Sequence, residues 1–119
     1  MKTVLFIDDE ERNLFILSRL FSSDFNVITA NSAAEGMKLI RDETVDIDAV
    51  VTDLKMPDIS GLQMLSEVEE LLKDKPKYLL TGYNHHKEID EALASNRITG
   101  VFKKPVDFEE IRKVILAQL

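Results

Sequence analysis

Cysteine is absent from this chain of 119 residues. Disulfide bridges and thiolate metal sites are therefore excluded, and a reducing compartment is compatible with the sequence. Long apolar runs are also missing, because the N-terminal run from Val4 to Ile7 ends at the acidic residues Asp8 to Glu11. This run is too short for the core of a signal peptide or for a membrane span. We expect a cytoplasmic protein that has no membrane partner.

Basic residues are too few to favour nucleic acid. The chain has 15 Lys and Arg residues against 22 Asp and Glu residues, which gives a formal net charge of −7. Such a chain repels phosphates, so we expect no direct nucleic acid binding. Neither glycine-rich nucleotide-binding fingerprint occurs. The remaining composition, with 45% hydrophobic and 31% charged residues, is typical of a globular protein, and the length predicts a single domain over residues 1–119.

Short apolar segments alternate with amphipathic ones along the whole chain. The short segments are bounded by turn residues, which is typical of buried strands. After each of them apolar residues recur at helical spacing, and capping boxes at Ser32, Ser60 and Asp107 open three of the expected helices. Such alternation predicts an α/β fold with a parallel sheet, helices on both faces and right-handed crossovers. The five expected strands are residues 2–7, 25–29, 48–53, 77–81 and 98–103.

The buried face of each helix follows from the same spacing. In the first helix, which we expect from Asn13, the predicted stripe consists of Ile16, Leu17, Leu20 and Phe21. Leu14 and Phe15 lie off this stripe and belong either to the edge of the core or to a partner surface. The third helix is expected to run from Gly61 to Lys75-Pro76. The inward residues of the later helices are Ala33, Met37 and Ile40; Leu62, Leu65, Val68 and Leu72; Ile89, Ala92 and Leu93; and Phe108, Ile111, Val114 and Ile115.

Polar residues that could carry chemistry follow four of the strands. Asp8 and Asp9 come after the first strand, Asp53 ends the third, Thr81 ends the fourth, and Lys104 follows the fifth. Each residue alone has a simpler interpretation, such as an acid at a helix start or a surface lysine. Together they favour a site, because the carboxyl ends of parallel strands share one edge, where open α/β sheets bind ligands.

The charge at this edge suggests a metal and a phosphoryl group. Three carboxylates repel one another, and one lysine leaves two net negative charges uncompensated. A divalent cation such as Mg²⁺ would neutralise them, and cation and lysine together could stabilise a phosphoryl group. A carboxylate can itself act as the nucleophile and form an aspartyl phosphate. Thr81 offers a hydroxyl group, and Gly82 would let the backbone approach a phosphoryl oxygen.

These residues resemble the CheY-like receiver domain of two-component response regulators. The resemblance covers essentially the whole chain and implies a flavodoxin-like, three-layer (βα)5 sandwich with strand order 2-1-3-4-5. It implies that Asp53 is the phosphoacceptor, that Asp9, Asp53 and the carbonyl of Lys55 hold Mg²⁺, and that Asp8 acts through water. The motifs that carry it are Asp8-Asp9, Asp53-Leu54-Lys55-Met56-Pro57 with Gly61, Thr81-Gly82 and Lys104-Pro105.

The resemblance also implies partners and an output. Thr81 and Lys104 would bind the phosphoryl group, which a sensor histidine kinase or a histidine phosphotransfer protein would supply. The output would reach a downstream effector domain or target protein, in some cases through a phosphorylation-dependent dimer. Both a free-standing regulator and a receiver excised from a longer protein are compatible with this chain.

Two other interpretations compete with a phosphorylation switch. A haloacid-dehalogenase-like phosphatase also forms an aspartyl phosphate, but it has a second acid two residues after its nucleophile, where this chain has Lys55. We therefore expect a regulatory domain that takes part in phosphotransfer and its own dephosphorylation, and not an enzyme. A degenerate receiver that only binds proteins is the remaining alternative, and the intact acids, Thr81 and Lys104 argue against it.

The chain departs from many receivers three residues before the lysine. That position usually holds an aromatic ring that moves on activation, and here it is Val101. Phe102 should point to the opposite face, because strand side chains alternate. We therefore expect switching in the loop after Thr81 and the short helix that follows. In that loop Tyr83 is expected to shield the acyl phosphate from water, whereas His85 and His86 are expected to be solvated.

Overall fold

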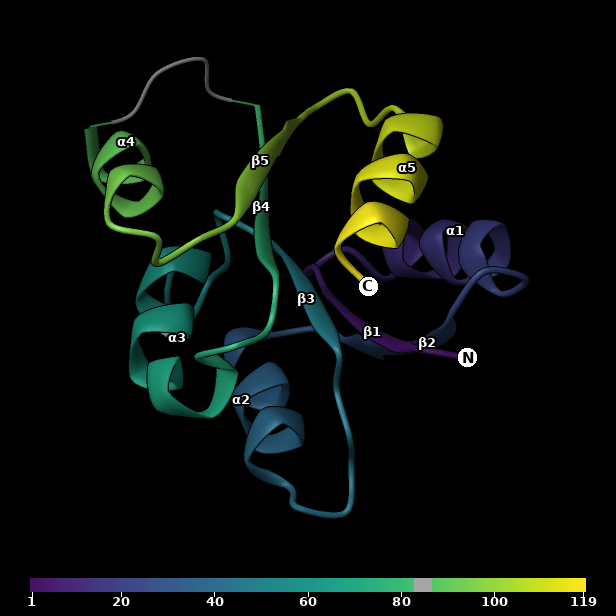
Figure 1. The fold of residues 1–119 in the computed structure, drawn as a ribbon, viewed down its shortest axis with the longest axis horizontal. Coiled ribbons are helices and arrows are strands. Elements are labelled where there is room, and N and C mark those ends of the chain that lie inside the picture. The colour runs from purple at the N-terminus through teal and green to yellow at the C-terminus, as the bar shows by residue number, and fades with distance from the viewer. Residues whose placement is uncertain (83–86) are drawn as a thin grey trace.

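The structure is a computed structural model that describes residues 1–82 and 87–119. One parallel sheet lies at its centre, with the strand order β2-β1-β3-β4-β5 (Figure 1). This is the predicted order, and the predicted strand boundaries agree to within two residues, which is the usual uncertainty at element ends. The strands are β1 (Thr3–Ile7), β2 (Asn26–Ala30), β3 (Ala49–Asp53), β4 (Lys77–Thr81) and β5 (Gly100–Lys103).

Helices cover both faces of the sheet, as expected. Figure 1 shows α1 and α5 on one side of the sheet and α2, α3 and α4 on the other. Ser32, Ser60 and Asp107 accept hydrogen bonds from the backbone N–H groups three residues later, so the predicted capping residues are confirmed. The helices are α1 (Glu11–Phe21), α2 (Ala33–Arg41), α3 (Gly61–Glu67), α4 (Lys87–Ala94) and α5 (Phe108–Gln118), and a short 3₁₀ helix, η1 (Glu69–Leu72), follows α3.

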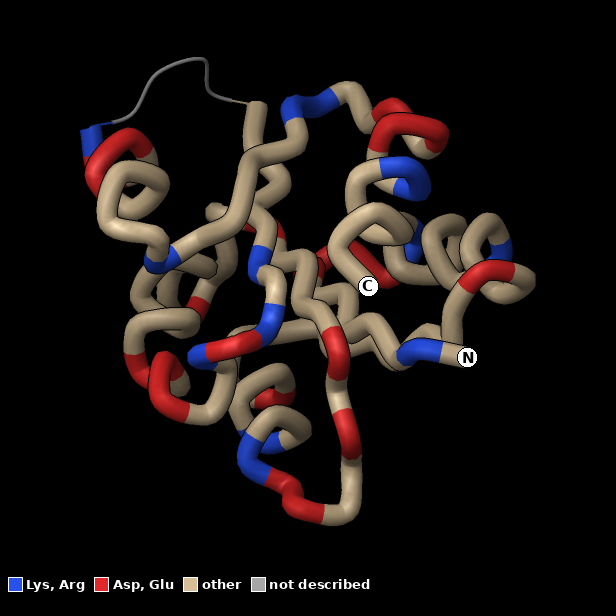
Figure 2. Tube along the Cα trace, viewed as in Figure 1, with Lys and Arg blue, Asp and Glu red and all other residues tan. Residues whose placement is uncertain are grey.

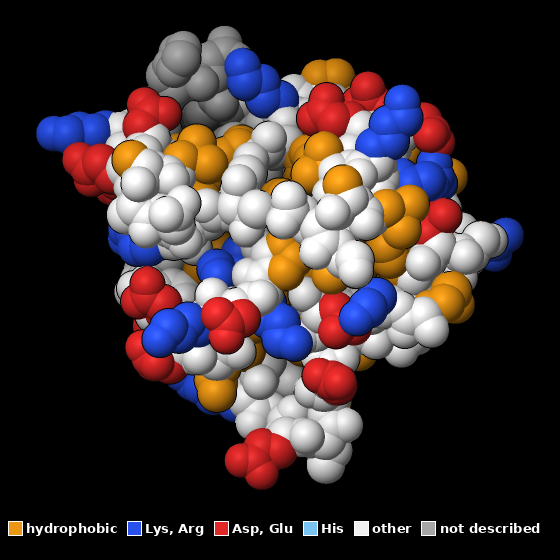
Figure 3. Space-filling model, in the orientation of Figure 1, with side chains coloured by type: hydrophobic (Ala, Val, Ile, Leu, Met, Phe, Trp, Pro, Cys, Tyr) orange, Lys and Arg blue, Asp and Glu red, His pale blue; other side chains and the backbone are white. Residues whose placement is uncertain are grey.

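The alternation of strand side chains divides the core into two layers. Leu5 and Val50 point toward α2, α3 and α4, whereas Phe6 and Val51 point toward α1 and α5. Because both faces are covered, β1, β3 and β4 are buried along their whole length and carry runs of adjacent apolar residues. On the face drawn in Figure 3, hydrophobic side chains fill the space between the elements and charged ones project around them. Within the described residues, no helix is long and apolar enough to cross a membrane.

The predicted rotation of α1 is partly wrong. Leu17 and Phe21 are buried as expected, but Leu14 is the third buried residue of the helix. Ile16 and Leu20 are each 40% exposed, and Phe15 is 63% exposed. Nearly every position between 14 and 21 that could face inward is apolar, so spacing alone allows two stripes. Packing against the sheet selects the one at i, i+3 and i+7. In α4, Leu93 is likewise 38% exposed.

The third helix is shorter than predicted. The α-helix ends at Glu67 because Val68 leaves the helical region, with φ −115° and ψ 19°, and the chain continues as η1. Leu65, Val68 and Leu72 are nevertheless buried, as expected. Lys77 stabilises the end of η1, because its buried Nζ donates hydrogen bonds to the carbonyl oxygens of Leu72 at 2.7 Å and Lys75 at 2.9 Å. Desolvation lowers the pKa of Lys77, although nearby acidic residues oppose this effect.

Candidate functional site

Three carboxylates meet at the carboxyl edge of the sheet. Asp8 and Asp9 directly follow β1, and Asp53 is the last residue of β3. The two strands are neighbours, with Ile7 opposite Thr52. One oxygen from each carboxylate lies within 4.8 Å of the other two. Asp8 and Asp53 are buried and Asp9 is exposed, so the cluster opens to solvent on the side of Asp9.

Asp8 is held on both carboxylate oxygens. Its Oδ1 accepts a hydrogen bond from the backbone N–H of Glu10 at 2.9 Å, and its Oδ2 accepts one from Nδ2 of Asn13 at 3.2 Å. Its own backbone N–H donates to the carbonyl of Ala30 in β2 at 3.1 Å. Asp8 therefore has a fixed position and orientation at the end of β1.

Burial and the ammonium group of Lys104 act in opposite directions on the carboxylate of Asp53. Burial raises its pKa, and the ammonium group of Lys104, at 3.2 Å from Oδ2, lowers the pKa only in part. The charge of Asp8 raises it further. The carboxylate of Asp53 is therefore undercompensated. Carboxylate oxygens with excess negative charge are the donor set that a hard divalent cation such as Mg²⁺ prefers, so these residues fit a metal site.

The strand ends opposite Asp53 are tied together by the backbone. The N–H of Lys104 donates to the carbonyl of Thr81 at 3.0 Å, and Thr81 itself is buried. Among the described residues, no atom lies within 4 Å of a Cβ atom added at Gly82. These side chains share a pocket of about 280 Å³, which is lined by Asp9, Glu10, Asp53, Leu54, Lys55, Thr81, Gly82 and Lys104.

The first residue of α3, Gly61, lies too close to Asp53 for any side chain. A Cβ atom at this position would lie 2.3 Å from the backbone oxygen of Asp53, so no other residue fits without moving the backbone. The N–H of Gly61 also donates to the carbonyl of Leu54 at 2.8 Å. The first turn of α3 is thus packed directly on the residue that carries the buried carboxylate.

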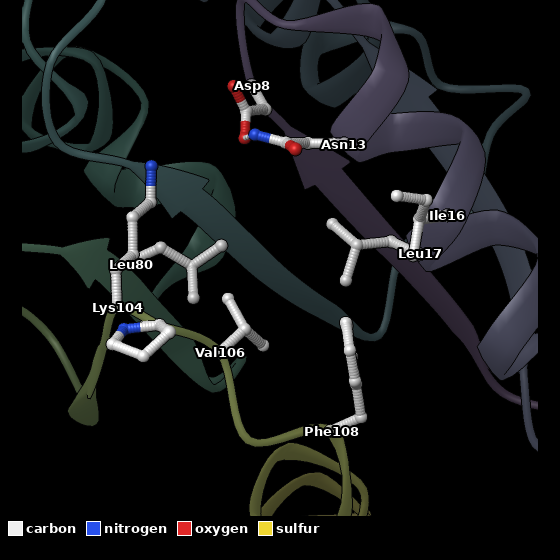
Figure 4. A pocket seen from close by; sticks show the side chains of 9 residues that line it. Asp8, Asn13, Ile16, Leu17, Leu80, Lys104, Val106 and Phe108 are labelled. Carbon is white, nitrogen blue, oxygen red and sulfur yellow. Dashed lines mark hydrogen bonds between the residues drawn. The ribbon is translucent and has the colours of Figure 1, made fainter.

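A second, more apolar pocket adjoins the site. Figure 4 shows Asp8 and Asn13 at one end of it and Lys104 across from them, with Leu17, Val106 and other apolar side chains between. Its volume is about 390 Å³. Figure 2 places the lysines at the end of β5 next to the acidic first turn of α5. The pocket is lined by Asp8, Asn13, Ile16, Leu17, Leu80, Lys104, Pro105, Val106 and Phe108.

The structure brings together every residue that the sequence proposed for the site. Asp8, Asp9 and Asp53 form the cluster, and Lys55, Thr81 and Lys104 line the same pocket as Asp9 and Asp53. Tyr83, His85 and His86 lie outside the described residues, so their expected roles stay predictions.

Sequence reasoning missed two residues around this cluster. Asn13 contacts Asp8, and the carboxylate of Asp58 accepts hydrogen bonds from the N–H groups of Ala33 at 3.4 Å and Ala34 at 2.9 Å. From the sequence, Asn13 is expected only as the start of a helix, and no role is predicted for Asp58. A polar residue within the first turn after an acid pair was the available signal for Asn13, whereas nothing local indicated that Asp58 reaches α2.

Val101 and Phe102 lie on opposite faces of β5, as predicted. Val101 is half-buried and packs with the core beneath α3 and α4. Phe102 is buried on the other face, where its ring centroid lies 5.1 Å from that of Tyr78. The buried ring of β5 is therefore held in the layer of α1 and α5, away from the position of Val101.

Comparison with known proteins identifies the family. Residues 4–116 match the model of the response regulator receiver domain. The transcriptional regulatory protein GlrR of Escherichia coli (strain K12) is 34% identical over 116 residues, which cover 94% of this chain and 25% of that protein. The hydrogenase transcriptional regulatory protein HoxA of Bradyrhizobium diazoefficiens is 33% identical over 103 residues, covering 87% of this chain and 21% of that protein. The chain thus spans about a quarter or less of these relatives.

Solved structures agree with the fold. A response regulator receiver domain protein from Clostridium thermocellum superposes with a TM-score of 0.85 at 29% identity, covering 99% of this chain and 94% of that one. The response regulator TrrA from Thermotoga maritima, in complex with Mg²⁺ and BeF, gives a TM-score of 0.82 at 29% identity, with both chains fully covered. With the family model, the strand order and these relatives in agreement, the chain belongs to the response regulator receiver domains, which are the phosphorylation-dependent switches of two-component signalling.

Proposed function

We propose that Asp53 is the residue on which this receiver domain is phosphorylated. The observation that carries the proposal is the ion pair at the edge of the sheet: Lys104 Nζ lies 3.2 Å from Oδ2 of Asp53, and both groups line an open pocket. A buried carboxylate that is undercompensated by one lysine is a reactive oxygen nucleophile beside a cation that can follow the transferred charge.

The transfer can be written with the residues of the pocket. A carboxylate oxygen of Asp53 attacks the phosphorus of a phosphohistidine, an O–P bond forms as the N–P bond breaks, and the histidine nitrogen keeps the electron pair. Lys104 neutralises negative charge on the phosphoryl oxygens, and the hydroxyl group of Thr81 donates a hydrogen bond to one of them. Gly82 would let the backbone approach this oxygen, and no atom of the described residues lies within 4 Å of a Cβ atom added at this position.

The proposed metal ligands are Asp9, Asp53 and the backbone carbonyl of Lys55, with Asp8 acting through water. When bound, Mg²⁺ supplies positive charge to the carboxylate cluster and to the phosphoryl oxygens. All of these donors are oxygens, and three of the residues involved carry the carboxylates that lie within 4.8 Å of one another. The structure of the relative TrrA with Mg²⁺ and BeF supports this choice of ion.

We propose a sensor histidine kinase or a histidine phosphotransfer protein as the phosphoryl donor. The output would pass to an effector domain or target protein, with a phosphorylation-dependent dimer as one route. The relatives named as transcriptional regulators are about four times longer than this chain, which supports an effector of that kind in proteins of this family. The domain would act as a regulator that takes part in phosphotransfer and in its own dephosphorylation, and residues 1–119 would form one such domain. The cytoplasmic location stays a prediction.

The assignment is tested with a small phosphoryl donor. Wild-type protein incubated with acetyl phosphate and Mg²⁺ should gain one phosphoryl group by intact-mass spectrometry, and Asp53→Asn should gain none. Asp46→Asn is the matched control, because Asp46 is an exposed carboxylate away from the site, and it should be labelled like the wild type. Labelling of Asp53→Asn, or equal labelling in excess chelator, would refute the proposal.

A further inference from the structure

The side chain of Asn13 holds one carboxylate oxygen of Asp8, Oδ2, in place. It lies in the first turn of α1, half-buried, and its Nδ2 donates to Oδ2 of Asp8 at 3.2 Å. Figure 4 shows the two side chains meeting at the end of the apolar pocket, across from Lys104. Asn13 is not part of any of the sequence motifs on which the resemblance to receiver domains rests.

The two hydrogen bonds to the carboxylate of Asp8 leave each of its oxygens free to accept one more. Each carboxylate oxygen has about two lone-pair positions, and each oxygen of Asp8 uses one, for the N–H of Glu10 or the amide of Asn13. Asp8 is only 2% exposed, so bulk water does not compete for the remaining positions. Rotation of the carboxylate would break both bonds inside a buried site, which costs more than in water.

The chemistry of an amide suits this place. Lys or Arg could also donate to Asp8, but either would add a positive charge beside the three carboxylates and so oppose a bound cation. The amide of Asn13 orients Asp8 and leaves the negative charge of the cluster intact. Groups that orient direct metal ligands change metal affinity typically about 10- to 100-fold when they are removed, and Asn13, which acts through Asp8 and a water molecule, should lie at the low end of this range.

We propose that Asn13 is a positioning residue for the divalent cation: it holds Asp8 in the orientation in which its carboxylate accepts from metal-bound water. The inference rests on the proposed function of this acidic cluster. It makes the first turn of α1 part of the metal site, although α1 supplies no metal ligand.

A purely structural role for Asn13 has to be separated from this one. The N-cap of α1 is Glu10, which makes no side-chain capping hydrogen bond, so the contacts from Asp8 also stabilise the start of the helix. Asn13→Leu separates the two roles, because leucine lacks the amide donor and has a higher helix propensity than asparagine. Asn26→Ala is a matched control, since it removes another amide hydrogen bond of 3.2 Å, to the hydroxyl group of Thr3 at the far end of the sheet.

The test measures Mg²⁺ affinity by isothermal titration calorimetry on the whole chain, together with unfolding in urea. We expect Asn13→Ala and Asn13→Leu to bind Mg²⁺ about 10-fold more weakly than wild type. Asn26→Ala should keep wild-type affinity. In an Asp8→Ala background, adding Asn13→Leu should change the affinity no further, because Asn13 acts through Asp8.

Each other outcome has a defined meaning. Wild-type affinity in Asn13→Leu, or an equal loss with and without Asp8, would overturn the inference while the proposed function stands. Wild-type protein that binds no Mg²⁺ would refute the proposed metal site and this inference with it. Weaker binding in Asn26→Ala, in step with its stability, would show that the loss in the Asn13 variants is a structural effect and would also overturn the inference.

Discussion

Lys104 Nζ and Oδ2 of Asp53 lie 3.2 Å apart, so a residue that follows β5 is joined to the last residue of β3 across the intervening strand β4. The ammonium group of Lys104 is therefore already bound to the carboxylate of Asp53 before any phosphoryl group is present. A phosphoryl group on Asp53 would offer this lysine new oxygens with more charge. On phosphorylation, Lys104 would therefore exchange its hydrogen bond to the carboxylate for one to a phosphoryl oxygen, and the number of its hydrogen bonds would not increase.

Removing Lys104 should separate phosphorylation from metal binding. In Lys104→Ala the metal ligands stay in place and a competing cation is lost, so we expect Mg²⁺ affinity to be unchanged or higher. Phosphorylation by acetyl phosphate should slow about 100-fold, the low end of what loss of one charge-stabilising donor costs. Asp9→Ala should instead weaken Mg²⁺ binding directly. Lys103→Ala, which removes the neighbouring exposed lysine, is the control. Equal loss of Mg²⁺ affinity in the Lys104 and Asp9 variants would contradict this division.

The buried carboxylate of Asp53 should cost stability at neutral pH. Because burial raises its pKa above the ordinary value of 3.8, the native state keeps the proton to higher pH than the unfolded state, and stability falls as pH rises through the native pKa. Without metal, Asp53→Asn should therefore be more stable than wild type at pH 7, and the difference should vanish below pH 3.8. Urea unfolding in chelator at both pH values measures it. A less stable Asp53→Asn at pH 7 would contradict the sign.

Mg²⁺ should remove much of that cost in the wild type. At a concentration about 100 times its Kd, the ion should raise the free energy of unfolding by about 2.7 kcal/mol, and it should stabilise Asp53→Asn less. Thermal unfolding with and without Mg²⁺ gives both values. A sodium salt at the same ionic strength replaces the Mg²⁺ salt in the control, because ionic screening alone would act equally on wild type and Asp53→Asn. Equal stabilisation of both proteins by Mg²⁺ would argue against Asp53 as a ligand.

Asp58 should stabilise the start of α2 from the neighbouring loop. Desolvation raises its pKa, but the hydrogen bonds from the backbone N–H groups of Ala34, Ile59, Asp58 itself and Ala33 together outweigh this effect and lower the pKa. Its contribution is therefore present above pH 3.8 and is lost as pH falls through the lowered native pKa. Asp58→Ala should lose about 1 kcal/mol at pH 7, as for loss of a helix cap, and less in acid. Chemical unfolding at both pH values, with Asp46→Ala alongside, tests this, and a loss that persists in acid would contradict it.

Tyr78 should tolerate the loss of its hydroxyl group. Within the described residues, its Oη is the buried side-chain atom without a hydrogen-bond partner, and burial raises its pKa. Tyr78→Phe keeps the ring contact with Phe102 and relieves an unsatisfied polar group, which typically costs about 1–3 kcal/mol. We expect a gain of about 1 kcal/mol in the free energy of unfolding. A loss of stability in calorimetry would show that the hydroxyl group has a partner.

Phosphorylation alone should shift the population only in part. Complete switching needs about 5.5 kcal/mol, and one hydrogen bond from Thr81 to a charged group supplies about 1.5–3 kcal/mol. Val101 offers no ring to relocate, and Phe102 is held against Tyr78. Backbone NMR shifts with beryllofluoride should therefore lie between two states until a partner binds. A complete change in slow exchange that reaches Val101 and α5 without a partner would contradict this prediction.

Much of the fold and the site could be predicted because both follow from short-range patterns. Short apolar segments bounded by turn residues locate the strands. The parallel topology then brings Asp8, Asp53 and Lys104 to the carboxyl edge of the sheet. The rotation of α1 could not be predicted, since consecutive apolar residues allow two stripes and only packing against the sheet selects one. Lys77 was missed for a related reason: its partners are carbonyl oxygens freed where η1 ends, and no sequence pattern records those.

The contact between Gly61 and Asp53 gives the site a mechanical connection that contains no side chain. Because the two backbones touch with no room for even one methyl group, the start of α3 cannot stay in place if the backbone of Asp53 shifts toward it. A displacement of a few tenths of an ångström at the carboxylate residue would pass to α3 as rigid-body motion instead of being absorbed by a rotamer change. The glycine at the start of α3 therefore makes this connection stiff.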